Sequence, residues 1–454
     1  MSNSSAHTTP LGRPFLTVWF GQTVSAIGSM VSGVGVAVWV YVETGSAAWL
    51  GVLTALSGVP FLLTGPLLPF IDRFPRRLVM IAGDGLAAVG TIVALVLAVF
   101  GRLEPWHLAA AGFVGGFGTA IQMPAFQASI PALVDERAVG RANGLNQFGS
   151  AAGLVAGPMI ATALVASFGV TAVLVVDVVT FVVAMVCTCS VRFAQTAPPR
   201  SATDDGTWGA AVAWLRDEGR PLIVLLMVMS VANFVFAFFN VASISVATAV
   251  GGTALSGLVL GAGGLAMIAS SIALGRFGVP DRRGRAMAIG LVVCGVGSAL
   301  VGLRPTLWLV IAAGAVTLGA VPLLSSTAAT VFHERVPSSM QGRVFGLRST
   351  IARALDPLGA ALAGVVIVRL AEPAMSSGSI GAESVGRVIG VGAERGAALV
   401  CIGVGMAIIG IAIVQRRALG ESLDRIDAAV ADEPVVATES DRDGAEGLVM
   451  VAID

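Results

Sequence analysis

The chain alternates long apolar runs with short polar segments, and the length of these runs predicts helices that cross a membrane. One crossing takes about twenty apolar residues, and the sequence offers about twelve runs of this length. The first six are expected at 15–41, 49–71, 78–100, 106–134, 142–166 and 170–192. The second six are expected at 221–250, 255–279, 286–303, 307–332, 344–370 and 396–415. The pattern predicts an all-α membrane protein.

Polar segments divide this pattern into five parts. The only long internal break contains Pro198-Pro199-Arg200 and an amphipathic stretch from Trp208 to Trp214, so we interpret it as a linker between two six-helix bundles. The acidic C-terminal segment loses the apolar period and is predicted to be disordered. A Ser/Gly-rich segment between Leu370 and Arg395 is predicted to be a flexible loop. The expected parts are an N-terminal segment 1–14, a bundle 15–192, a linker 193–219, a bundle 220–416 and a tail 417–454.

Composition excludes a soluble globular protein. Of the 454 residues, 56% are apolar and 12% are charged, whereas soluble domains carry about a quarter charged residues; the mean hydropathy is +0.89. The formal net charge is zero, so the chain lacks the basic field that attracts nucleic acid. No nucleic-acid partner is expected.

The sequence has no pattern typical of ATP binding, metal binding or catalysis. Every basic residue other than histidine is an arginine, and a phosphate-binding loop of the Walker type requires lysine, so ATP-driven transport by this chain alone is excluded. The three histidines are too scattered for a metal site. No pair of nucleophile and base suggests an enzyme. We therefore expect no catalytic residue, no metal and no cofactor.

The two halves of the sequence repeat. Arg102 to Trp106 and Arg304 to Trp308 lie at an offset of 202 residues, and Gly140-Arg141 aligns with Gly342-Arg343 at the same offset. Two matches in one register predict two bundles related by a parallel repeat, with a substrate site between them near the middle of the membrane.

The distribution of arginines predicts the orientation of the chain. Cytoplasmic loops carry an excess of basic residues, and most arginines fall on one side if both termini are cytoplasmic. The outer segments then keep only Arg102, Arg304, Arg369, Arg387 and Arg395.

A charged hairpin between the second and third expected helices carries the strongest motif. It resembles the Gly-x-Leu-Ala-Asp-Arg-x-Gly-Arg-Arg signature of the major facilitator superfamily, although Leu68 and Pro75 replace its two glycines. The matching charged residues are Asp72, Arg73, Arg76 and Arg77. A counterpart in the second half is formed by Asp281, Arg282 and Arg283.

The resemblance implies a conformational latch that closes the cytoplasmic side in the outward-open state. A carboxylate favours helix N-termini and a guanidinium favours C-terminal carbonyls. The alternative is that the arginines only set the topology. We favour the latch for Asp72 and Arg73, and a topological role for Arg77.

Further stretches of sequence resemble one branch of this superfamily. Gly153, Gly157 and Pro158 in the fifth expected helix resemble the antiporter motif of the superfamily, with Ala161-Thr162 in place of its terminal glycines. Stretches starting at Gln22, Glu43 and Gly140 resemble the branch of the enterobactin exporter and the macrolide-efflux transporters. The resemblance implies a proton-coupled exporter in a bacterial plasma membrane that works by alternating access. The implied substrates are drugs, siderophores or other secondary metabolites.

Four ionisable residues at membrane depth are candidates for proton coupling: Asp356, Arg353, Asp177 and Asp84. Ionisable groups are costly at this depth and usually mark function. Asp356 could exchange a proton, or could form a permanent ion pair with Arg353 one turn earlier; the sequence leaves both open. For Asp84 we favour a structural role, because it lies close to the charged hairpin.

The implied fold lines its central path with the first, fourth, seventh and tenth helices. Their polar and aromatic residues suit a bulky amphipathic substrate, although such residues also hold helices together. The candidates for the substrate cavity are Gln22, Ser25, Gln122, Gln127, Asn233, Phe236, Asn240, Ser325 and Ser326.

Three functions follow from these observations. The first is an efflux antiporter that functions as a monomer in the bilayer, with a small amphipathic substrate and the proton gradient as its energy source. The second is an importer or a carrier of lipid-like substrates on the same fold. The third is a non-transporting membrane receptor or assembly partner that acts through its acidic tail.

Overall fold

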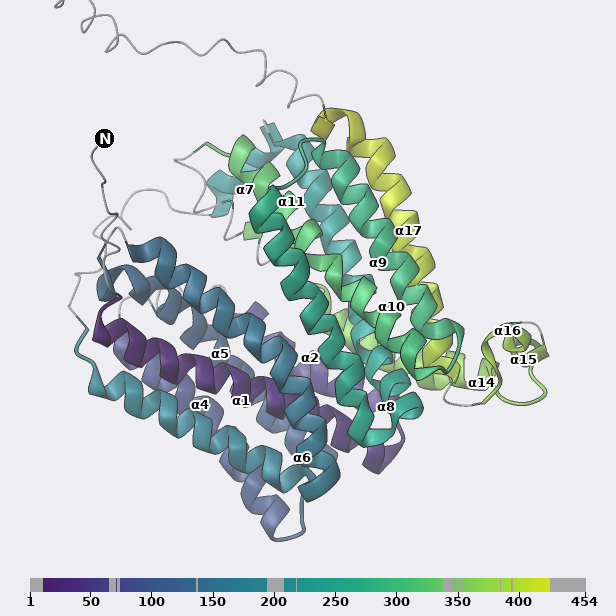
Figure 1. Ribbon diagram of the computed structural model, residues 1–454, viewed down its shortest axis with the longest axis horizontal. Helices are drawn as coiled ribbons and strands as arrows, with labels where there is room; N and C mark the ends of the chain where they lie inside the picture. The colour runs from purple at the N-terminus through teal and green to yellow at the C-terminus, as the bar shows by residue number, and fades with distance from the viewer. Residues whose placement is uncertain are drawn as a thin grey trace, which may run out of the picture.

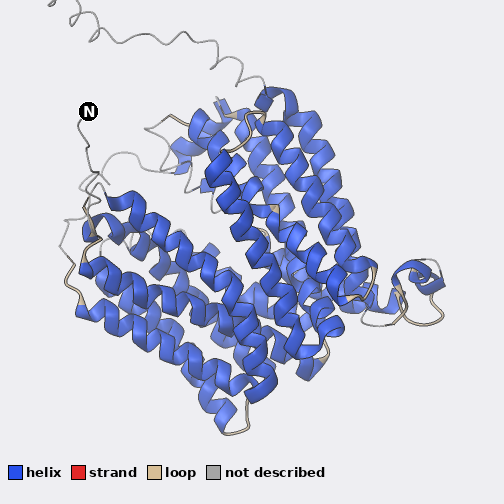
Figure 2. Ribbon diagram, in the orientation of Figure 1, coloured by secondary structure: helices blue, strands red, loops and turns tan. Residues whose placement is uncertain are grey.

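The computed structural model describes residues 11–64, 71, 74–135, 138–193, 208–217, 219–337, 344, 347–348, 351–352, 354–383, 385–392 and 395–424. All regular elements in these residues are helices (Figure 2). Eleven of the helices are long and apolar enough to cross a membrane, by length and composition. One of them, Ala152–Ser190, is broken at Gly169 and supplies two crossings. The all-α class and the expected number of crossings are confirmed.

In the described residues the N-terminal bundle comprises five helical elements of more than one turn. They are α1 (Arg13–Thr44), α2 (Ala47–Thr64), α4 (Arg76–Val99), α5 (Pro105–Leu133) and α6 (Val139–Ser190). Gly169 has φ 72° and ψ −173°, a conformation that favours glycine. It divides α6 into the fifth and sixth crossings, as the sequence predicts.

The C-terminal bundle follows the amphipathic helix α7 (Trp208–Asp217). In α8 (Arg220–Phe277), Gly252 has φ 63° and separates the seventh and eighth crossings. The next helices are α9 (Arg283–Leu303), α10 (Leu307–Gly319) and α11 (Val321–Arg335). The last are α13 (Asp356–Val366), the π-helix η3 (Ile367–Ala371), α14 (Glu372–Ala374), α15 (Ile380–Glu383), α16 (Gly386–Ile389) and α17 (Arg395–Asp424).

Three predictions about the C-terminal half differ from the structure. The tail was expected to begin at 417, but α17 continues to Asp424; the residues after 424 lie outside the described part. The segment between Leu370 and Arg395 was expected to be a flexible loop, but η3 and three short helices occupy much of it. The eleventh helix was expected to be continuous, but a turn at 354–355 precedes α13.

The break before α13 has a clear physical cause. Pro357 lacks a backbone N–H and cannot continue the hydrogen-bond ladder of the preceding turn. Two side chains of α8 donate hydrogen bonds to backbone carbonyls that precede the break. Asn233 Nδ2 donates to the carbonyl of Ala352 at 2.8 Å, and Ser230 Oγ donates to that of Ile351 at 2.9 Å. Irregular backbone at membrane depth persists where such partners exist.

Glycines set the distance between α1 and α6. A Cβ atom on Gly28 would lie 2.8 Å from Thr180 Cβ, and one on Gly35 would lie 2.9 Å from Val173 Cγ1. Neither position has room for a side chain. Small residues of this kind allow helix backbones in a membrane to pack closely.

The two bundles diverge on one side and meet on the other (Figure 1). We call the first the linker side, because α7, the start of α1 and the end of α17 lie there. On the opposite side α2 packs against α13, where a Cβ on Gly51 would lie 2.5 Å from the carbonyl oxygen of Ala360. There α6 also packs against α8, with Gly257 against Pro158. Backbone contacts therefore close the opposite side.

Replacement of Gly364 tests this closure. A Cβ on Gly364 would lie 2.7 Å from Ala48 Cα, whereas a Cβ on Gly410 would meet no atom within 4 Å. Overpacking of a tight contact costs about 1–3 kcal/mol, so Gly364→Val should lower Tm in detergent more than the matched control Gly410→Val. Equal melting temperatures would contradict the close contact.

Candidate functional site

The first charged hairpin is bound to the ends of helices in its own bundle. Arg76 donates a hydrogen bond to the carbonyl of Ala128 in α5, and Arg77 donates one to that of Cys189 in α6. Both carbonyls lie toward the C-terminal ends of their helices, where a positive charge is favourable. Asp72 and Arg73 lie outside the described residues, so their expected role stays a prediction.

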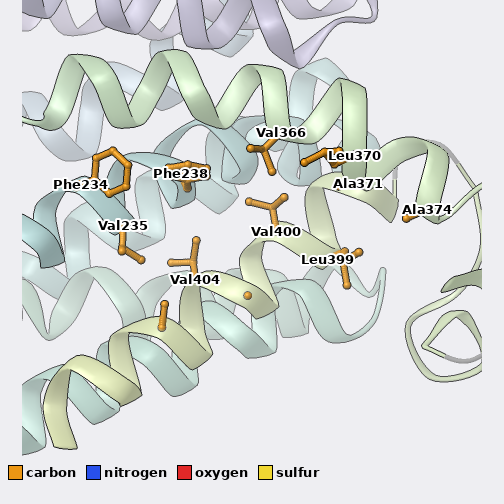
Figure 3. Close-up of a pocket in the computed structure, with 12 residues that line it drawn as sticks. Phe234, Val235, Phe238, Val366, Leu370, Ala371, Ala374, Leu399, Val400 and Val404 are labelled. Atoms are coloured by element: carbon orange, nitrogen blue, oxygen red, sulfur yellow. The ribbon is translucent and has the colours of Figure 1, made fainter. Parts of the chain in front are cut away.

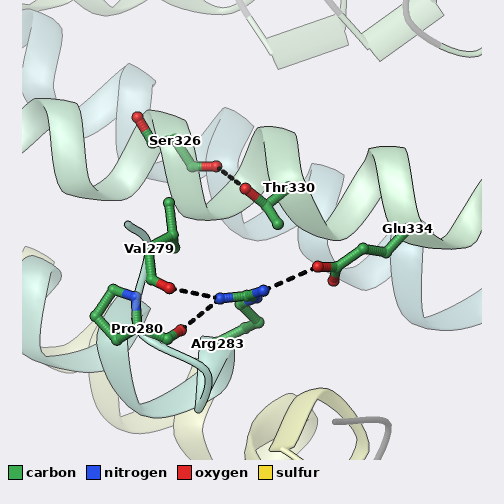
Figure 4. Close-up of polar contacts among 6 residues, drawn as sticks. All are labelled: Val279, Pro280, Arg283, Ser326, Thr330 and Glu334. Atoms are coloured by element: carbon green, nitrogen blue, oxygen red, sulfur yellow. Dashed lines mark hydrogen bonds and ion pairs between the residues drawn. The ribbon is translucent and has the colours of Figure 1, made fainter. Parts of the chain in front are cut away.

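In the second hairpin Arg283 contacts both its own loop and helix α11 (Figure 4). Arg283 Nη1 donates to the carbonyls of Val279 at 2.8 Å and Pro280 at 2.7 Å. Its Nη2 lies 2.9 Å from Oε1 of Glu334 in the last turn of α11. The other two predicted residues, Asp281 and Arg282, are exposed.

The helices that follow the two hairpins begin with equivalent arginines. Arg76 is the first residue of α4 and Arg283 is the first residue of α9. Each reaches the next crossing of its own bundle, α5 or α11. Among the described residues these contacts stay within one bundle. The bundles diverge on this side, so the contacts do not form a latch between them in this state.

The antiporter-like motif lies between the two bundles. A Cβ on Gly153 would lie 3.6 Å from Ile27 Cγ1 of α1, and a Cβ on Gly157 would lie 2.8 Å from Met30 Cβ of the same helix. Pro158 is buried, and its carbonyl faces Gly257 of α8. The motif therefore provides close packing at the point where α6 meets both α1 and α8.

A buried polar network joins four helices of the N-terminal bundle. Gln22 Nε2 donates to Asp84 Oδ2 at 2.9 Å and approaches Thr188 Oγ1 at 3.3 Å. Gln122 donates to Gln22 Oε1. Asp84 is only 3% exposed. Helices α1, α4, α5 and α6 each contribute one residue, which supports the structural role favoured for Asp84.

Asp177 in α6 is also buried, with 3% exposure. Thr91 Oγ1 of α4 donates a hydrogen bond to its Oδ2 at 2.9 Å. Its Oδ1 has no hydrogen-bond partner among the described residues. In this part of the chain neither Asp177 nor Asp84 forms an ion pair.

Asp356 occupies a different kind of position. It is the first residue of α13 and is partly buried. A carboxylate is favourable at a helix N-terminus, so this placement accounts for an acid without a proton-transfer role. Arg353 lies outside the described residues, and the expected pair stays a prediction.

The cavity candidates fall into two groups. The first group holds helices together: Gln22 and Gln122 in the network, Asn233 at the break, and the buried Ser25. The second group is exposed and bonds only within its own helix or not at all in the described part: Asn240, whose amide donates to the carbonyl of Phe236, Ser325 and Gln127.

Two further candidates are partly buried. The ring of Phe236 stacks on that of Phe239, with centroids 5.3 Å apart. The carbonyl of Ser326 accepts a hydrogen bond from Thr330 Oγ1 (Figure 4). The structure thus brings together Gln22 of α1 and Gln122 of α5. It leaves the other cavity candidates apart from them.

An open pocket that the sequence does not predict lies between helices of the C-terminal bundle (Figure 3). Its volume is about 520 Å³, and its walls come from α8, the end of α13, η3, α14 and α17. Phe234, Phe238, Leu370 and Val404 are among the lining residues, all of which are apolar. Specific ligand sites include a few polar groups that fix orientation, so this cavity does not replace the predicted substrate path.

Comparisons with known proteins agree with this architecture. The model of the Major Facilitator Superfamily matches residues 18–363. Macrolide efflux protein A of Streptococcus pyogenes is 25% identical over 370 residues, which are 78% of this chain and 90% of that protein. A protein of the same name from Enterococcus faecalis is 25% identical over 329 residues, 69% of this chain and 99% of that protein.

Solved structures share the fold. The nucleoside transporter NupG superposes with a TM-score of 0.67 at 11% identity and covers 89% of this chain and 99% of its own. A bacterial homologue of the human lysosomal transporter Spinster, in an inward-facing conformation, gives a TM-score of 0.68 at 14% identity, over 91% and 98% of the two chains.

The second hairpin offers a matched pair of arginines. Arg283→Ala removes three hydrogen bonds, whereas Arg282→Ala removes the same charge from an exposed neighbour. We expect Arg283→Ala to cost about 1–2 kcal/mol, and Arg282→Ala to stay within about 0.5 kcal/mol. Thermal unfolding in detergent compares the two. A similar loss for both would mean that Arg283 contributes only charge.

The buried network can be tested at Gln22. Gln22→Leu leaves Asp84 without its amide donor, and an unsatisfied buried group of this kind costs about 1–3 kcal/mol. Gln127→Leu is the control, because Gln127 is exposed. Gln22→Leu should unfold at a clearly lower temperature. If the two variants unfold alike, the network does not stabilise the bundle.

Proposed function

Because the chain belongs to the Major Facilitator Superfamily and is therefore a membrane transporter rather than an enzyme, we propose that it exports an amphipathic compound of the macrolide type in exchange for protons. The observation that carries this proposal is similarity over most of the chain to two proteins named for macrolide efflux. Siderophores and other secondary metabolites belong to the same class of amphipathic substrate. The second candidate is an importer on the same fold.

The arrangement of the bundles supports alternating access. They diverge on the linker side and are closed by α2–α13 and α6–α8 contacts on the opposite side. The excess of arginines supports a cytoplasmic position for the linker side. An exporter must take up its substrate from this side, and the state described here would do so. Release then requires the glycine contacts to separate and the linker side to close.

The exposed polar residues support an uncharged or weakly charged binding surface. Gln127, Asn240 and Ser325 offer amides and a hydroxyl without a fixed charge. They lie on α5, α8 and α11, which are the fourth, seventh and tenth crossings. A large substrate with hydroxyl and carbonyl groups can hydrogen-bond to such residues while its apolar parts contact neighbouring side chains.

Transport into inside-out membrane vesicles tests the proposal. An acidified vesicle lumen should drive accumulation of radiolabelled erythromycin several-fold above vesicles without the protein, and a protonophore should abolish it. A siderophore and a lipophilic cation test the wider substrate class. Accumulation only in right-side-out vesicles would support the importer. No accumulation of any compound in either orientation would overturn transport of this class.

A truncated chain separates transport from a receptor function. Removal of residues 425–454 leaves α17 intact, since this helix ends at Asp424. Accumulation should be unchanged if the acidic tail is incidental. Loss of transport in a correctly inserted, thermally stable truncation would favour an assembly partner that acts on the tail.

A further inference from the structure

We propose that Asp177 binds the coupled proton, in a site formed by α1, α4 and α6 within the N-terminal bundle. This inference rests on the proposed proton exchange and adds its location. The reaction is simple: the carboxylate takes up one proton to become a carboxylic acid, and releases it again, with no other bond made or broken.

The first observation is that tightly packed helices enclose the site. Asp177 lies between Val173 and Thr180 on the face of α6 that packs against α1. Gly35 and Gly28 of α1 leave no space at these two positions. The helices therefore enclose the carboxyl group above and below.

The second observation is an incomplete set of partners. Thr91 donates to Oδ2 at 2.9 Å, but Oδ1 is buried and accepts no hydrogen bond in the described part of the chain. An ionised carboxylate without a counter-charge is costly inside a membrane. A proton on Oδ1 removes the charge and turns the orphaned acceptor into a donor.

The charged groups of the surrounding helices do not supply a counter-charge. In α1 they lie at the ends, Arg13 and Glu43, and in α8 they are Arg220 and Arg276, again at the ends. In α6 the arginine is Arg141, near its start.

The remaining charges belong to α4, whose arginines begin the helix and bind carbonyls of α5 and α6. Its other titratable group, Asp84, lies two turns before Thr91 and accepts from Gln22. The cysteines of α6, Cys187 and Cys189, lie near its end. Asp177 thus differs from Asp84 in having a fully buried oxygen without a hydrogen-bond partner in the described part of the chain.

The third observation links the site to the other bundle. Ser29 of α1 is exposed, and Ser32, one turn further along the helix, is half-buried. Beside them, Val31 and Val173 pack in one apolar cluster with Ile244 of α8. A shift of α8 during alternating access would change this packing and with it the access of water to Asp177.

The experiment uses the full-length chain in proteoliposomes with erythromycin as the probe. Asp177→Asn mimics the protonated side chain, so substrate-triggered proton movement should fall about tenfold or more. Exchange of labelled for unlabelled erythromycin without a gradient should remain, and should no longer depend on pH. Asp84→Asn is the matched control, which should retain proton movement although its melting temperature falls.

A second variant tests the same site in case Asp177→Asn does not fold. Thr91→Val keeps the carboxyl group but removes the donor to its ionised form, so the pH midpoint of transport should move to higher pH. Thr162→Val is the control, because the hydroxyl of this buried threonine bonds only carbonyls of its own helix. An unchanged midpoint in Thr91→Val would overturn the assignment.

The remaining outcomes separate the two proposals. If wild type and Asp177→Asn move protons equally well, Asp177 is not the site, while proton exchange stands. If wild type moves protons with none of the compounds, the proposed exchange fails and the assignment fails with it. If sodium rather than pH controls erythromycin exchange, the proton assignment is overturned although coupled transport remains.

Discussion

The structure depends on one constraint: the hydrocarbon interior of a membrane offers no hydrogen bonds to the backbone. Helices satisfy this constraint internally, and each departure from a helix in the described chain has a local remedy. Gly169 and Gly252 turn the chain between crossings. At the break before Pro357, Asn233 and Ser230 of a neighbouring helix bind the exposed carbonyls. Asn233, which the sequence predicts to contact a substrate, thus hydrogen-bonds to a backbone carbonyl instead.

The same constraint governs the charged residues. Arginines at the starts of α4 and α9 bind helix carbonyls or a carboxylate near the membrane surface, where the charge costs little. At greater depth the carboxyl group of Asp84 accepts from an amide and that of Asp177 accepts from a hydroxyl. A group in such a position must be neutral or must gain a cation, and this is what makes it useful for coupling transport to a gradient.

The helices and the hairpins could be predicted from the sequence because their signals are local. Apolar length fixes the crossings, and charges between two crossings fix a hairpin. The role of Asn233 could not be predicted, because it depends on a break in a helix more than a hundred residues away along the chain. The different surroundings of Asp84 and Asp177 could not be predicted either. Both read as isolated acids in apolar helices, and only the packing of α1 and α4 shows which oxygen has a partner.

The two halves retain different parts of their common design. The equivalent arginines, Arg76 and Arg283, keep their place at the start of a helix and still reach the next crossing. The buried seam of amides, hydroxyls and carboxyls lies in the N-terminal bundle, while the described C-terminal bundle has a helix break and an apolar cavity. In the proposed alternating access both halves close on the linker side, so elements that hold the hairpins are needed in both. The proposed proton site is needed only once, so the other copy of the duplicated bundle is free to differ.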